Sequence, residues 1–561
     1  MKFDLDLLDA AERACHQRGA WSPFPELPSL YPDAEAAQAV GRAAFQARLG
    51  QPFVFSMPMP GAPASAVAAH EVSPYTREPL GIAYPVPAID DLFAAAQSAG
   101  PAWAEAGPER RLALLLAVVQ RLYSQHLFEL TQAVMHTAGQ SFNMAYAGSG
   151  VNALDRAIEA LVHARQAMAA VPASARWARS FGSARIELDK TYRLVPRGVA
   201  VCFACASFPT WNAWPSMMAS LATGNAVIVK PHPATVLPMA ITVQVFRAVL
   251  AEAGFNPDLV TMVVDTPEAP LGKALVKHPS CAIVDFTGST RFGQWVEQNA
   301  HPALAFTETA GVNTVVLHSF ADEAAFDAAL RALATTASMF SAQMCTSPQN
   351  LYVAPDGVRV GAAQVPFAEV GERFAAAMAA LAKDPRRAAM ILATVQSEAT
   401  LALVRQMAEA ATQTGRVLLA PGAYVHPEFP NARTCTPLVA ELDTTARALY
   451  GEERFGPISF VIRADDPLAE ATRDVRQFGG LTAFLYADDE AVISRAEALY
   501  ARAGAQLTIN LTGPMPLNFA AAYSDFHVTG LNPAGNAALT SLAFVAGRFC
   551  IVQSRRPARS V

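Results

Sequence analysis

The sequence lacks a long hydrophobic run and lacks an excess of basic residues. Its longest apolar segment, "LALLLAVV" at residues 112–119, is far shorter than the roughly 20 residues that a membrane-spanning helix needs, so a buried helix is expected there. The formal net charge is −6, and the one basic cluster, "SRRPAR" near the C-terminus, is expected to be solvated. These features predict that the protein binds neither nucleic acid nor membrane.

Signs of secretion and of disulfide bonding are also missing. The N-terminal "MKFDLDLLDAAERACHQ" carries charges every few residues and has no apolar stretch of the kind found in a secretory leader. The seven cysteines are scattered and odd in number within a large chain, which is typical of reduced thiols. We therefore expect a cytoplasmic protein.

Cys202 and Cys205 form a C-x-x-C pair, a spacing found in zinc and redox sites. No second pair and no histidine at ligand spacing accompanies it. The pair also lies in an apolar run of strand type, where residues three apart face opposite sides. We expect both thiols to pack in the core and predict no metal site.

The organisation of the chain changes along its length. Residues 1–75 mix short helical signals with proline-rich breaks such as "WSPFPELPSLYP", which predicts an extension that wraps onto a larger body. Helical periodicity follows to about residue 173. Asp90 or Asp91 is the expected N-cap of its first helix, and Pro108 is expected in the first turn of a second.

A different period begins after Tyr192. The runs "RLVPRGVAVCFACA" and "GNAVIVKP" are rich in valine and bounded by glycine and proline, which is typical of strands buried on both faces. They alternate with helical stretches such as "TVLPMAITVQVFRAVLAEAG", where Gly254 is a plausible C′ residue. The same alternation resumes after Asn313. It predicts an α/β fold with parallel sheets, arranged as two domains in series.

Two segments at strand ends could bind an anion. In "VDFTGSTRFGQWV" a buried strand opens into a helix through Gly288 and Ser289, which leaves free backbone N–H groups for a phosphate. An ordinary strand-to-helix turn is the alternative. Lys230 ends the strand "AVIVK", at the sheet edge where α/β folds bind ligands, although a lysine there can also simply reach solvent.

Two further residues have side chains suited to catalysis. Glu308 lies among small and apolar residues in "LAFTETAGVNTVV", where burial would raise its pKa toward the range of a general base. Cys345 lies in "SMFSAQMCTSPQN", after a long helical segment and before polar residues. By composition alone, a surface glutamate and a buried, inert cysteine are the alternatives.

Five segments in order resemble the successive signatures of one family. They are "SFPTWNAWPSMMASLATGNAVIVKP", "FTGSTRFG", "FTETAG", "SAQMCTS" and "GEERFGPISFV". Together they resemble the aldehyde dehydrogenase superfamily, and the long N-terminal extension is similar to that of its phenylacetate-degradation (PaaN-type) branch. The resemblance implies two Rossmann-type parallel-sheet domains with a small oligomerisation arm.

The resemblance also implies how the chain is divided. We expect an N-terminal extension over residues 1–75 and a dinucleotide-binding domain over 76–307, with the arm at about 178–195. A catalytic domain would follow over 308–525. Residues 526–561 would return to the cofactor and oligomerisation region, and the protein would form a homodimer or homotetramer.

The resemblance assigns roles to single residues. Cys345 would attack the aldehyde to form a thiohemiacetal, which loses hydride to a nicotinamide ring, and Glu308 would activate the water that hydrolyses the resulting thioester. Cys345 should therefore be prone to form the thiolate, helped by a nearby cofactor charge or by local dipoles rather than by a triad. The cofactor would be held by Lys230 at the adenosine ribose, by Gly288, Ser289 and Gly293 at the pyrophosphate turn, and by Glu453 and Phe455 at the nicotinamide ribose.

Two positions depart from the family pattern. Ser207 replaces the asparagine whose amide completes the oxyanion hole, and loss of such a donor costs about 10²- to 10³-fold in rate. Pro233 replaces a glutamate that grips the adenosine ribose in many NAD-selective members. Without that carboxylate, Lys230 and His232 are free to neutralise a 2′-phosphate, so we expect NADP as the cofactor, with NAD possible.

The expected function is NAD(P)-dependent oxidation of a small-molecule aldehyde to a carboxylic acid. The branch resemblance suggests a CoA-linked semialdehyde from aromatic degradation as the substrate. A CoA-acylating dehydrogenase is one alternative, although such relatives generally lack a glutamate at the position of Glu308. An inactive scaffold or binding protein with the same fold is the other alternative.

Overall fold

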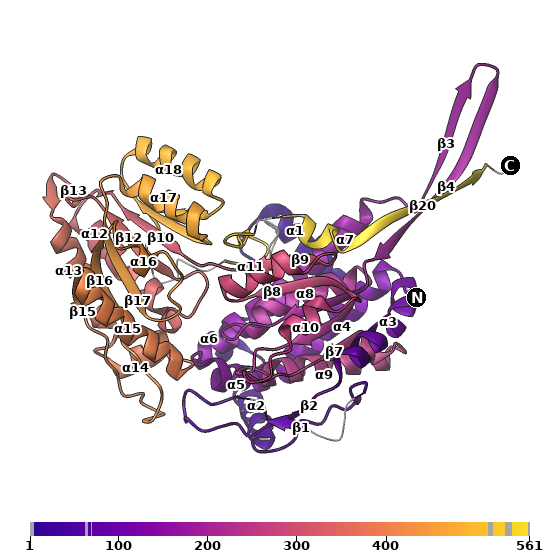
Figure 1. The fold of residues 1–561 in the computed structure, drawn as a ribbon, viewed down its shortest axis with the longest axis horizontal. Coiled ribbons are helices and arrows are strands. Elements are labelled where there is room, and N and C mark those ends of the chain that lie inside the picture. The colour runs from indigo at the N-terminus through magenta and orange to yellow at the C-terminus, as the bar shows by residue number, and fades with distance from the viewer. Residues whose placement is uncertain (1–4, 62–65, 69, 514–519, 533–540, 559–561) are drawn as a thin grey trace.

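Two mainly parallel sheets organise the molecule and lie in two separate lobes (Figure 1). This computed structural model describes residues 5–61, 66–68, 70–513, 520–532 and 541–558. Among these residues, no helix combines the length and the apolar character needed to cross a bilayer. The α/β class with parallel sheets is the one expected from the sequence.

The first sheet has five parallel strands in the order β7-β6-β5-β8-β9. Every residue of its central strand is buried, because helices cover both faces of the sheet and the strand must be apolar throughout. In chain order the strands are β5 (Val199–Phe203), β6 (Ala226–Lys230), β7 (Val260–Met262), β8 (Cys281–Thr287) and β9 (Leu304–Glu308).

Helices surround this sheet and share one apolar core with it. Those of the first lobe are α3 (Ile89–Glu105), α4 (Pro108–Arg121), α5 (Leu127–Ala138), α6 (Phe142–Tyr146), α7 (Asn152–Ala169), α8 (Pro209–Ala222), α9 (Leu237–Glu252), α10 (Gly272–Lys277) and α11 (Thr290–Asn299). Two π-helical segments, Leu122–His126 and Ala147–Val151, interrupt the series, and a short 3₁₀ turn, Pro257–Leu259, precedes β7.

Most local predictions for this lobe are confirmed. Pro108 is the first residue of α4, the apolar run 112–119 lies within that helix, and Gly254 follows α9 with a φ of 81°. The prediction of an aspartate N-cap is wrong. Helix α3 begins at Ile89, and its N-cap is Ala88, which makes no side-chain capping bond.

The second sheet has seven strands in the order β15-β16-β17-β12-β10-β18-β19, of which only the β15–β16 pair is antiparallel. Its strands are β10 (Asn313–Leu317), β12 (Pro348–Val353), β15 (Arg416–Leu419), β16 (Leu438–Asp443), β17 (Ile458–Arg463), β18 (Thr482–Tyr486) and β19 (Gln506–Ile509). The small sheet beside it contains β11 (Ser319–Phe320), β13 (Val358–Val360) and β14 (Ala363–Val365). The helices of this lobe are α12 (Glu323–Ser338), α13 (Phe367–Leu381), α14 (Pro385–Ile391), α15 (Glu398–Thr414), α16 (Arg447–Tyr450), α17 (Pro467–Phe478) and α18 (Glu490–Ala503).

Helix α12 ends at Ser338, earlier than its apolar periodicity suggests. The reason is local backbone geometry, because Phe340, Ser341 and Ala342 all have positive φ values, of 53°, 49° and 51°. Residues with side chains rarely adopt this left-handed conformation, and each one costs energy that the surrounding packing must supply. The segment is buried and directly precedes Cys345.

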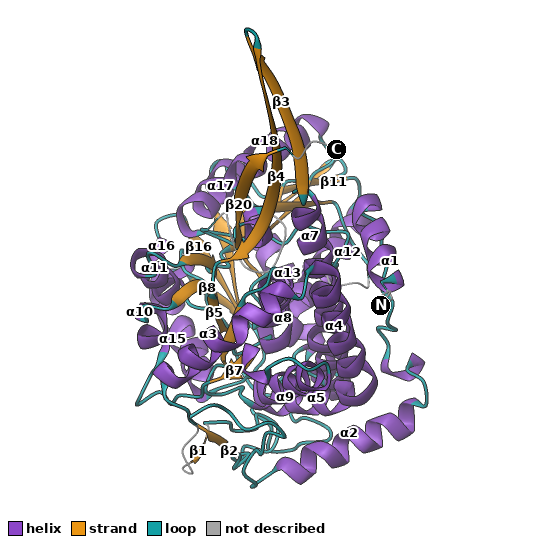
Figure 2. Cartoon of the chain, turned by 90° about the vertical axis from the view of Figure 1, so that its right-hand side faces the viewer, coloured by secondary structure: helices purple, strands orange, loops and turns teal. Residues whose placement is uncertain are grey.

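A long antiparallel arm projects from the first lobe (Figure 2). It consists of β3 (Ser174–Phe181), β4 (Ala184–Pro196) and the C-terminal strand β20 (Phe549–Pro557), in the order β20-β4-β3. The hairpin covers slightly more than the expected residues 178–195. The C-terminal segment returns to the first lobe before β20, which then runs outward along β4 from Phe549, opposite Pro196, to Pro557, opposite Leu188.

A buried ion pair fixes this C-terminal return. Arg548, which follows the short helix α19 (Ala543–Ala546), is fully buried and bonds Asp285 of β8 through both guanidinium nitrogens, at 2.6 and 2.8 Å. Its backbone carbonyl accepts a bond from Asn225. The end of the chain is therefore anchored to the middle of the first sheet.

The N-terminal residues pack onto the first lobe. Helix α1 (Asp6–Gln17) contacts α7, and Leu8 and Ala11 belong to the same core as the five-stranded sheet. After the short turn Pro28–Leu30, helix α2 (Ala34–Arg48) lies against α5, and the small sheet β1 (Ala66–Ala68) with β2 (Ala83–Pro85) follows. Trp21 contacts Tyr523 edge-on, so the two ends of the chain meet on this lobe.

Candidate active site

A cavity of about 1550 Å³ contains most of the residues singled out in the sequence. It is bordered by the carboxyl ends of β5, β6, β8 and β9 and by residues that precede β12 and β17. The predicted site residues in its lining are Ser207, Lys230, His232, Gly288, Ser289, Glu308, Cys345, Glu453 and Phe455. The structure therefore brings together side chains that are far apart in the sequence.

Two of the predicted cofactor residues do not line this cavity, namely Pro233 and Gly293. Gly293 is buried in α11, where a Cβ atom would lie 2.3 Å from Cγ2 of Thr309. It is a glycine because the helix packs closely against the chain that follows β9. Pro233 is half-buried in the segment after β6.

Asn313 fixes the backbone around Cys345. Its side-chain amide donates to the carbonyl of Cys345 at 2.8 Å and to that of Ser347 at 2.9 Å. Its side-chain oxygen accepts from the backbone N–H groups of Leu481 and Thr482. Asn313 is completely buried at the start of β10, so one side chain ties the cysteine loop to the start of β18.

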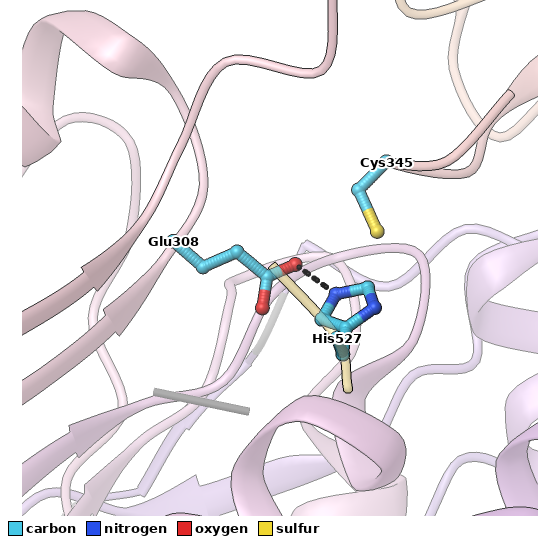
Figure 3. Close-up of side chains that lie close together, drawn as sticks. All are labelled: Glu308, Cys345 and His527. Carbon is cyan, nitrogen blue, oxygen red and sulfur yellow. Dashed lines mark hydrogen bonds and ion pairs between the residues drawn. The ribbon is translucent and has the colours of Figure 1, made fainter. Parts of the chain in front are cut away.

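Glu308 ends strand β9 and is 2% exposed, which confirms the expected burial. Its Oε1 lies 3.2 Å from Nε2 of His527, and its Oε2 accepts a bond from Asn212 Nδ2 at 3.4 Å. Figure 3 shows the glutamate and the histidine side by side, with the Cys345 sulfur next to them. The Glu308 carboxylate, the Cys345 sulfur and the His527 ring each place a polar atom within 4.8 Å of the other two.

The protein groups around Cys345 oppose ionisation of its thiol. Burial raises the pKa of the Cys345 thiol well above its usual value, and the carboxylates of Glu308 and Glu453 raise it further. The cause is electrostatic, because a thiolate in this corner would be poorly solvated and close to two negative charges. The thiol is therefore protonated at neutral pH and must lose its proton when it reacts.

Glu453 enters the same cavity from the segment before β17. Burial raises its pKa to about 7, with a further contribution from Glu308, while a backbone bond from Gly311 lowers it. Gly311 has to be a glycine, because a Cβ atom there would lie 2.3 Å from the Cys345 carbonyl oxygen and 2.5 Å from Oε1 of Glu453. The carboxylate and the cysteine loop approach each other across this residue.

The C-x-x-C pair behaves differently from the expectation. Cys202 is buried in β5, as predicted, and lies 3.2 Å from Oγ of Ser216. Cys205, in contrast, is half-buried and lines the cavity. The Cys205 thiol donates to Oδ1 of Asn212 at 3.3 Å, and burial raises the pKa of Cys205 to about 11.

Lys230 has an acidic partner that the sequence did not reveal. Its Nζ lies 2.6 Å from Oδ1 of Asp265, just beyond β7, and both residues are buried and line the cavity. Oδ2 of Asp265 accepts a bond from the backbone of Leu271 at 2.9 Å. The positive charge at this end of the cavity is therefore compensated by a carboxylate that is held in place.

The strand-turn-helix prediction is confirmed at α11. Strand β8 ends at Thr287, Ser289 is the N-cap of α11, and Gly288 to Arg291 line the cavity. No side chain caps this helix end. Its first backbone N–H groups and the positive end of the helix dipole suit a phosphate group.

Comparison with known proteins identifies the family. The sequence profile of the aldehyde dehydrogenase family matches residues 64–514, which is most of the chain. This chain belongs to the aldehyde dehydrogenase family. It is therefore an enzyme of the class that oxidises aldehydes.

Solved structures and curated proteins agree with this assignment. The chain is 42% identical to an NAD-dependent aldehyde dehydrogenase from Burkholderia multivorans, with a TM-score of 0.93 and coverage of 99% of this chain and 98% of that one. A 1-pyrroline-5-carboxylate dehydrogenase from Thermus with bound NAD shares the fold at 21% identity, with a TM-score of 0.74 and coverage of 96% and 99%. The vanillin dehydrogenase of Pseudomonas fluorescens is 26% identical over 71% of this chain and 77% of its own length.

Among the described residues, the candidate site contains four side chains that the sequence did not point out. They are Asn212, Asp265, Asn313 and His527. His527 lies far from the other site residues in sequence, and a lone histidine in "SDFHVTG" carries no pattern. Only the course of the C-terminal segment places it beside Glu308.

We predict that Asn313→Ala destabilises the protein and misplaces Cys345. Each buried backbone group left without its partner costs about 1–3 kcal/mol, and Asn313 serves four of them. The melting temperature should fall markedly, and alkylation of Cys345 by iodoacetamide should change in rate. Asn431→Ala, at an exposed loop position, is the matched control. An unchanged melting temperature for Asn313→Ala would contradict the assigned role.

Proposed function

We propose that this enzyme oxidises an aldehyde to a carboxylic acid with NAD, using Cys345 as nucleophile and Glu308 as base. The observation that carries the proposal is the contact between the Cys345 thiol and the Glu308 carboxylate, in a cavity that also holds Lys230 and the first residues of α11. A nucleophile, a base and an anion site open into one space.

The first step requires a base. The Cys345 sulfur attacks the aldehyde carbon, a C–S bond forms, and the carbonyl oxygen becomes an oxyanion. Because the thiol is protonated in this environment, its proton passes to the nearby carboxylate of Glu308. The backbone N–H of Cys345 and the hydroxyl of Ser207 are the proposed donors to the oxyanion.

The cavity fits a dinucleotide. The exposed N–H groups at α11 suit a pyrophosphate, Lys230 with Asp265 suits the adenosine ribose, and Glu453 with Phe455 suits the nicotinamide ribose. NAD, when bound, accepts a hydride from the thiohemiacetal and leaves a thioester on Cys345. The close approach at Gly311 keeps Glu453 near the cysteine without an intervening side chain.

Hydrolysis of the thioester completes the proposed reaction. Glu308 takes a proton from water, the water oxygen bonds the acyl carbon, and the C–S bond breaks to release the acid and the thiol. A CoA-acylating reaction would not need a carboxylate at this position, so the buried Glu308 beside Cys345 favours water as acceptor. The intact set of Cys345, Glu308 and Glu453 likewise argues against an inactive scaffold.

Asp265 supports NAD rather than NADP. The sequence favoured NADP because Pro233 removes a carboxylate from the adenosine end of the cavity. That premise does not hold, since Asp265 supplies a carboxylate 2.6 Å from Lys230. It would repel a 2′-phosphate and can accept bonds from ribose hydroxyls. The similar enzyme from Burkholderia multivorans is described as NAD-dependent, which agrees with this choice.

The substrate class is the least constrained part of the proposal. The resemblance to the phenylacetate-degradation branch favours a semialdehyde, with a CoA-linked one as the specific hypothesis. The similar proteins include dehydrogenases named for vanillin and for α-ketoglutaric semialdehyde, so aromatic and aliphatic aldehydes both belong in a substrate screen. An NAD-reduction assay with aliphatic, aromatic and CoA-tethered aldehydes separates these classes.

We predict that Glu308→Gln still forms the thioester, because loss of the adjacent charge lowers the pKa of the Cys345 thiol and lets its proton pass to water, but does not hydrolyse it. Reduced cofactor should appear as one burst per active site, followed by turnover about 10²- to 10⁴-fold slower than in the parent, because a general base has been removed. Absorbance at 340 nm after rapid mixing measures both phases. Cys345→Ser should show no burst. Steady turnover of Glu308→Gln at the parent rate would rule out this role for Glu308.

Replacing Asp265 by serine should weaken NAD binding and improve NADP binding. We expect about 10-fold weaker NAD binding, because bonds to a charged group contribute about 1.5–3 kcal/mol. Lys230, released from its partner, becomes available to a 2′-phosphate. Dissociation constants from isothermal titration calorimetry test this without turnover, with the exposed Asp356→Ser as control. Unchanged constants, or a parent enzyme that prefers NADP, would count against the role of Asp265.

We also propose that the arm of β3, β4 and β20 joins protomers into a homodimer or homotetramer. It projects from the first lobe and exposes apolar side chains, including Ile551 at 56% and Val552 at 52%. Changing both to aspartate should shift sedimentation toward the monomer, whereas Val425→Asp, at an exposed site off the arm, should not. A parent enzyme that sediments as a monomer would refute the proposal.

A further inference from the structure

In the proposed reaction, the carboxylate of Glu308 accepts a proton twice. Glu308 first takes the proton of the Cys345 thiol, because burial and neighbouring carboxylates keep that thiol protonated. It must then take a proton from the water that hydrolyses the thioester. Between the two steps it has to give the first proton away, yet it is 2% exposed. The side chains bonded to the carboxylate are the nearest candidates to receive that proton.

His527 is in direct contact with this carboxylate. Its Nε2 lies 3.2 Å from Oε1 of Glu308, and its ring is 2% exposed. The second oxygen of Glu308 faces Asn212, whose amide can donate but cannot accept a proton. Of these two side chains among the described residues, only the histidine has a ring nitrogen that can accept a proton.

The neighbours of His527 fix its ring. The indole of Trp211, on α8, meets it edge-on with the ring centres 4.8 Å apart. The guanidinium of Arg156, on α7, covers the indole at 5.2 Å and bonds the carbonyls of Ala520 and Asp525. Among the described residues, the ionisable groups facing this corner are Glu308, Cys345, Cys205, Glu453 and, behind the indole, Arg156.

The backbone on the C-terminal side of His527 is also held. Thr309, next to Glu308, pairs with the segment around Gly530, and its N–H donates to the carbonyl of Thr529. Gly530 has a φ of 76°, and a Cβ atom there would lie 1.8 Å from the Thr309 carbonyl oxygen. Only glycine permits this approach, which keeps the histidine opposite the carboxylate.

The segment just before His527 packs against α7 and against the N-terminal extension. The backbone N–H of Tyr523 donates to Glu159 of α7 at 3.2 Å. Trp21 contacts the Tyr523 ring edge-on, and the Ser524 hydroxyl donates to the Arg18 carbonyl. The extension thus contributes to the support behind His527.

We propose that His527 is a positioning residue that orients Glu308 and receives its proton between acylation and hydrolysis. This inference rests on the proposed function. Transfer from the Glu308 carboxyl to Nε2 restores the carboxylate and leaves an imidazolium next to it. The imidazolium then releases a proton into the cavity that His527 also lines, so that the thiol proton leaves Glu308 before water is activated.

The experiment measures the lifetime of an acyl group on Cys345, with p-nitrophenyl acetate as the probe. The ester acetylates the thiol and releases p-nitrophenol, with no need for NAD or for the natural aldehyde. After excess ester is removed, intact-mass spectrometry follows loss of the acetyl group. His527→Gln keeps a donor toward Glu308 but cannot carry a proton, whereas His527→Leu does neither.

We expect His527→Gln to lengthen the acetyl lifetime about 10- to 100-fold, at the lower end of general acid-base effects, and His527→Leu to lengthen it at least as much. Because the histidine acts through Glu308, Glu308→Gln with His527→Gln should deacylate no more slowly than Glu308→Gln alone. The exposed His16→Gln is the matched control. Thermal melting confirms that each variant is folded.

Three outcomes would overturn parts of this inference. A parent-like lifetime in both His527 variants removes any role for the histidine. A parent-like lifetime in His527→Gln, with a longer one in His527→Leu, shows that the histidine orients Glu308 but does not receive its proton. If the double variant loses the acetyl group more slowly than Glu308→Gln, by the same factor that His527→Gln causes alone, then His527 does not act through Glu308. If instead the parent enzyme is not acetylated at Cys345, with Cys345→Ser labelled equally, the proposed function itself has failed.

Discussion

The contact between the Cys345 thiol and the Glu308 carboxylate is the interaction on which the rest of the site depends. Burial and the nearby Glu308 carboxylate raise the pKa of the half-buried Cys345 thiol, which protects the nucleophile from ionising without a substrate. The same closeness lets the carboxylate remove the proton when an aldehyde arrives. To act as a base, Glu308 must hold its carboxylate in a fixed position. The bonds from His527 and Asn212 to its two oxygens do this.

This geometry requires both lobes and both ends of the chain. Glu308 ends a strand of the first sheet, whereas Cys345 precedes a strand of the second and is tied down by Asn313. His527 lies on the C-terminal segment, whose end is anchored in the first sheet through the buried pair of Arg548 and Asp285. The left-handed residues before Cys345 are a local cost that this surrounding packing supports.

The sequence predicted the strands, turns and fold of the molecule better than the electrostatics of its site. Strands such as 226–230 and the turn at Gly288 follow from apolar runs and small residues, and the order of five motifs pointed to the family. The ionisation of Cys345, in contrast, depends on which carboxylates the fold places beside it. Asp265 was missed for the same reason, because it faces Lys230 only through pairing of β6 with β7. His527 approaches Glu308 through long-range packing that no local pattern records.

The pH dependence of Cys345 alkylation by iodoacetamide tests the central claim most directly, because only the thiolate reacts. The account predicts that the thiol of the parent enzyme titrates above the usual range for cysteine, and that Glu308→Gln lowers its pKa by removing the adjacent charge. A parent thiol that titrates near or below neutral pH, with no response to Glu308→Gln, would contradict it.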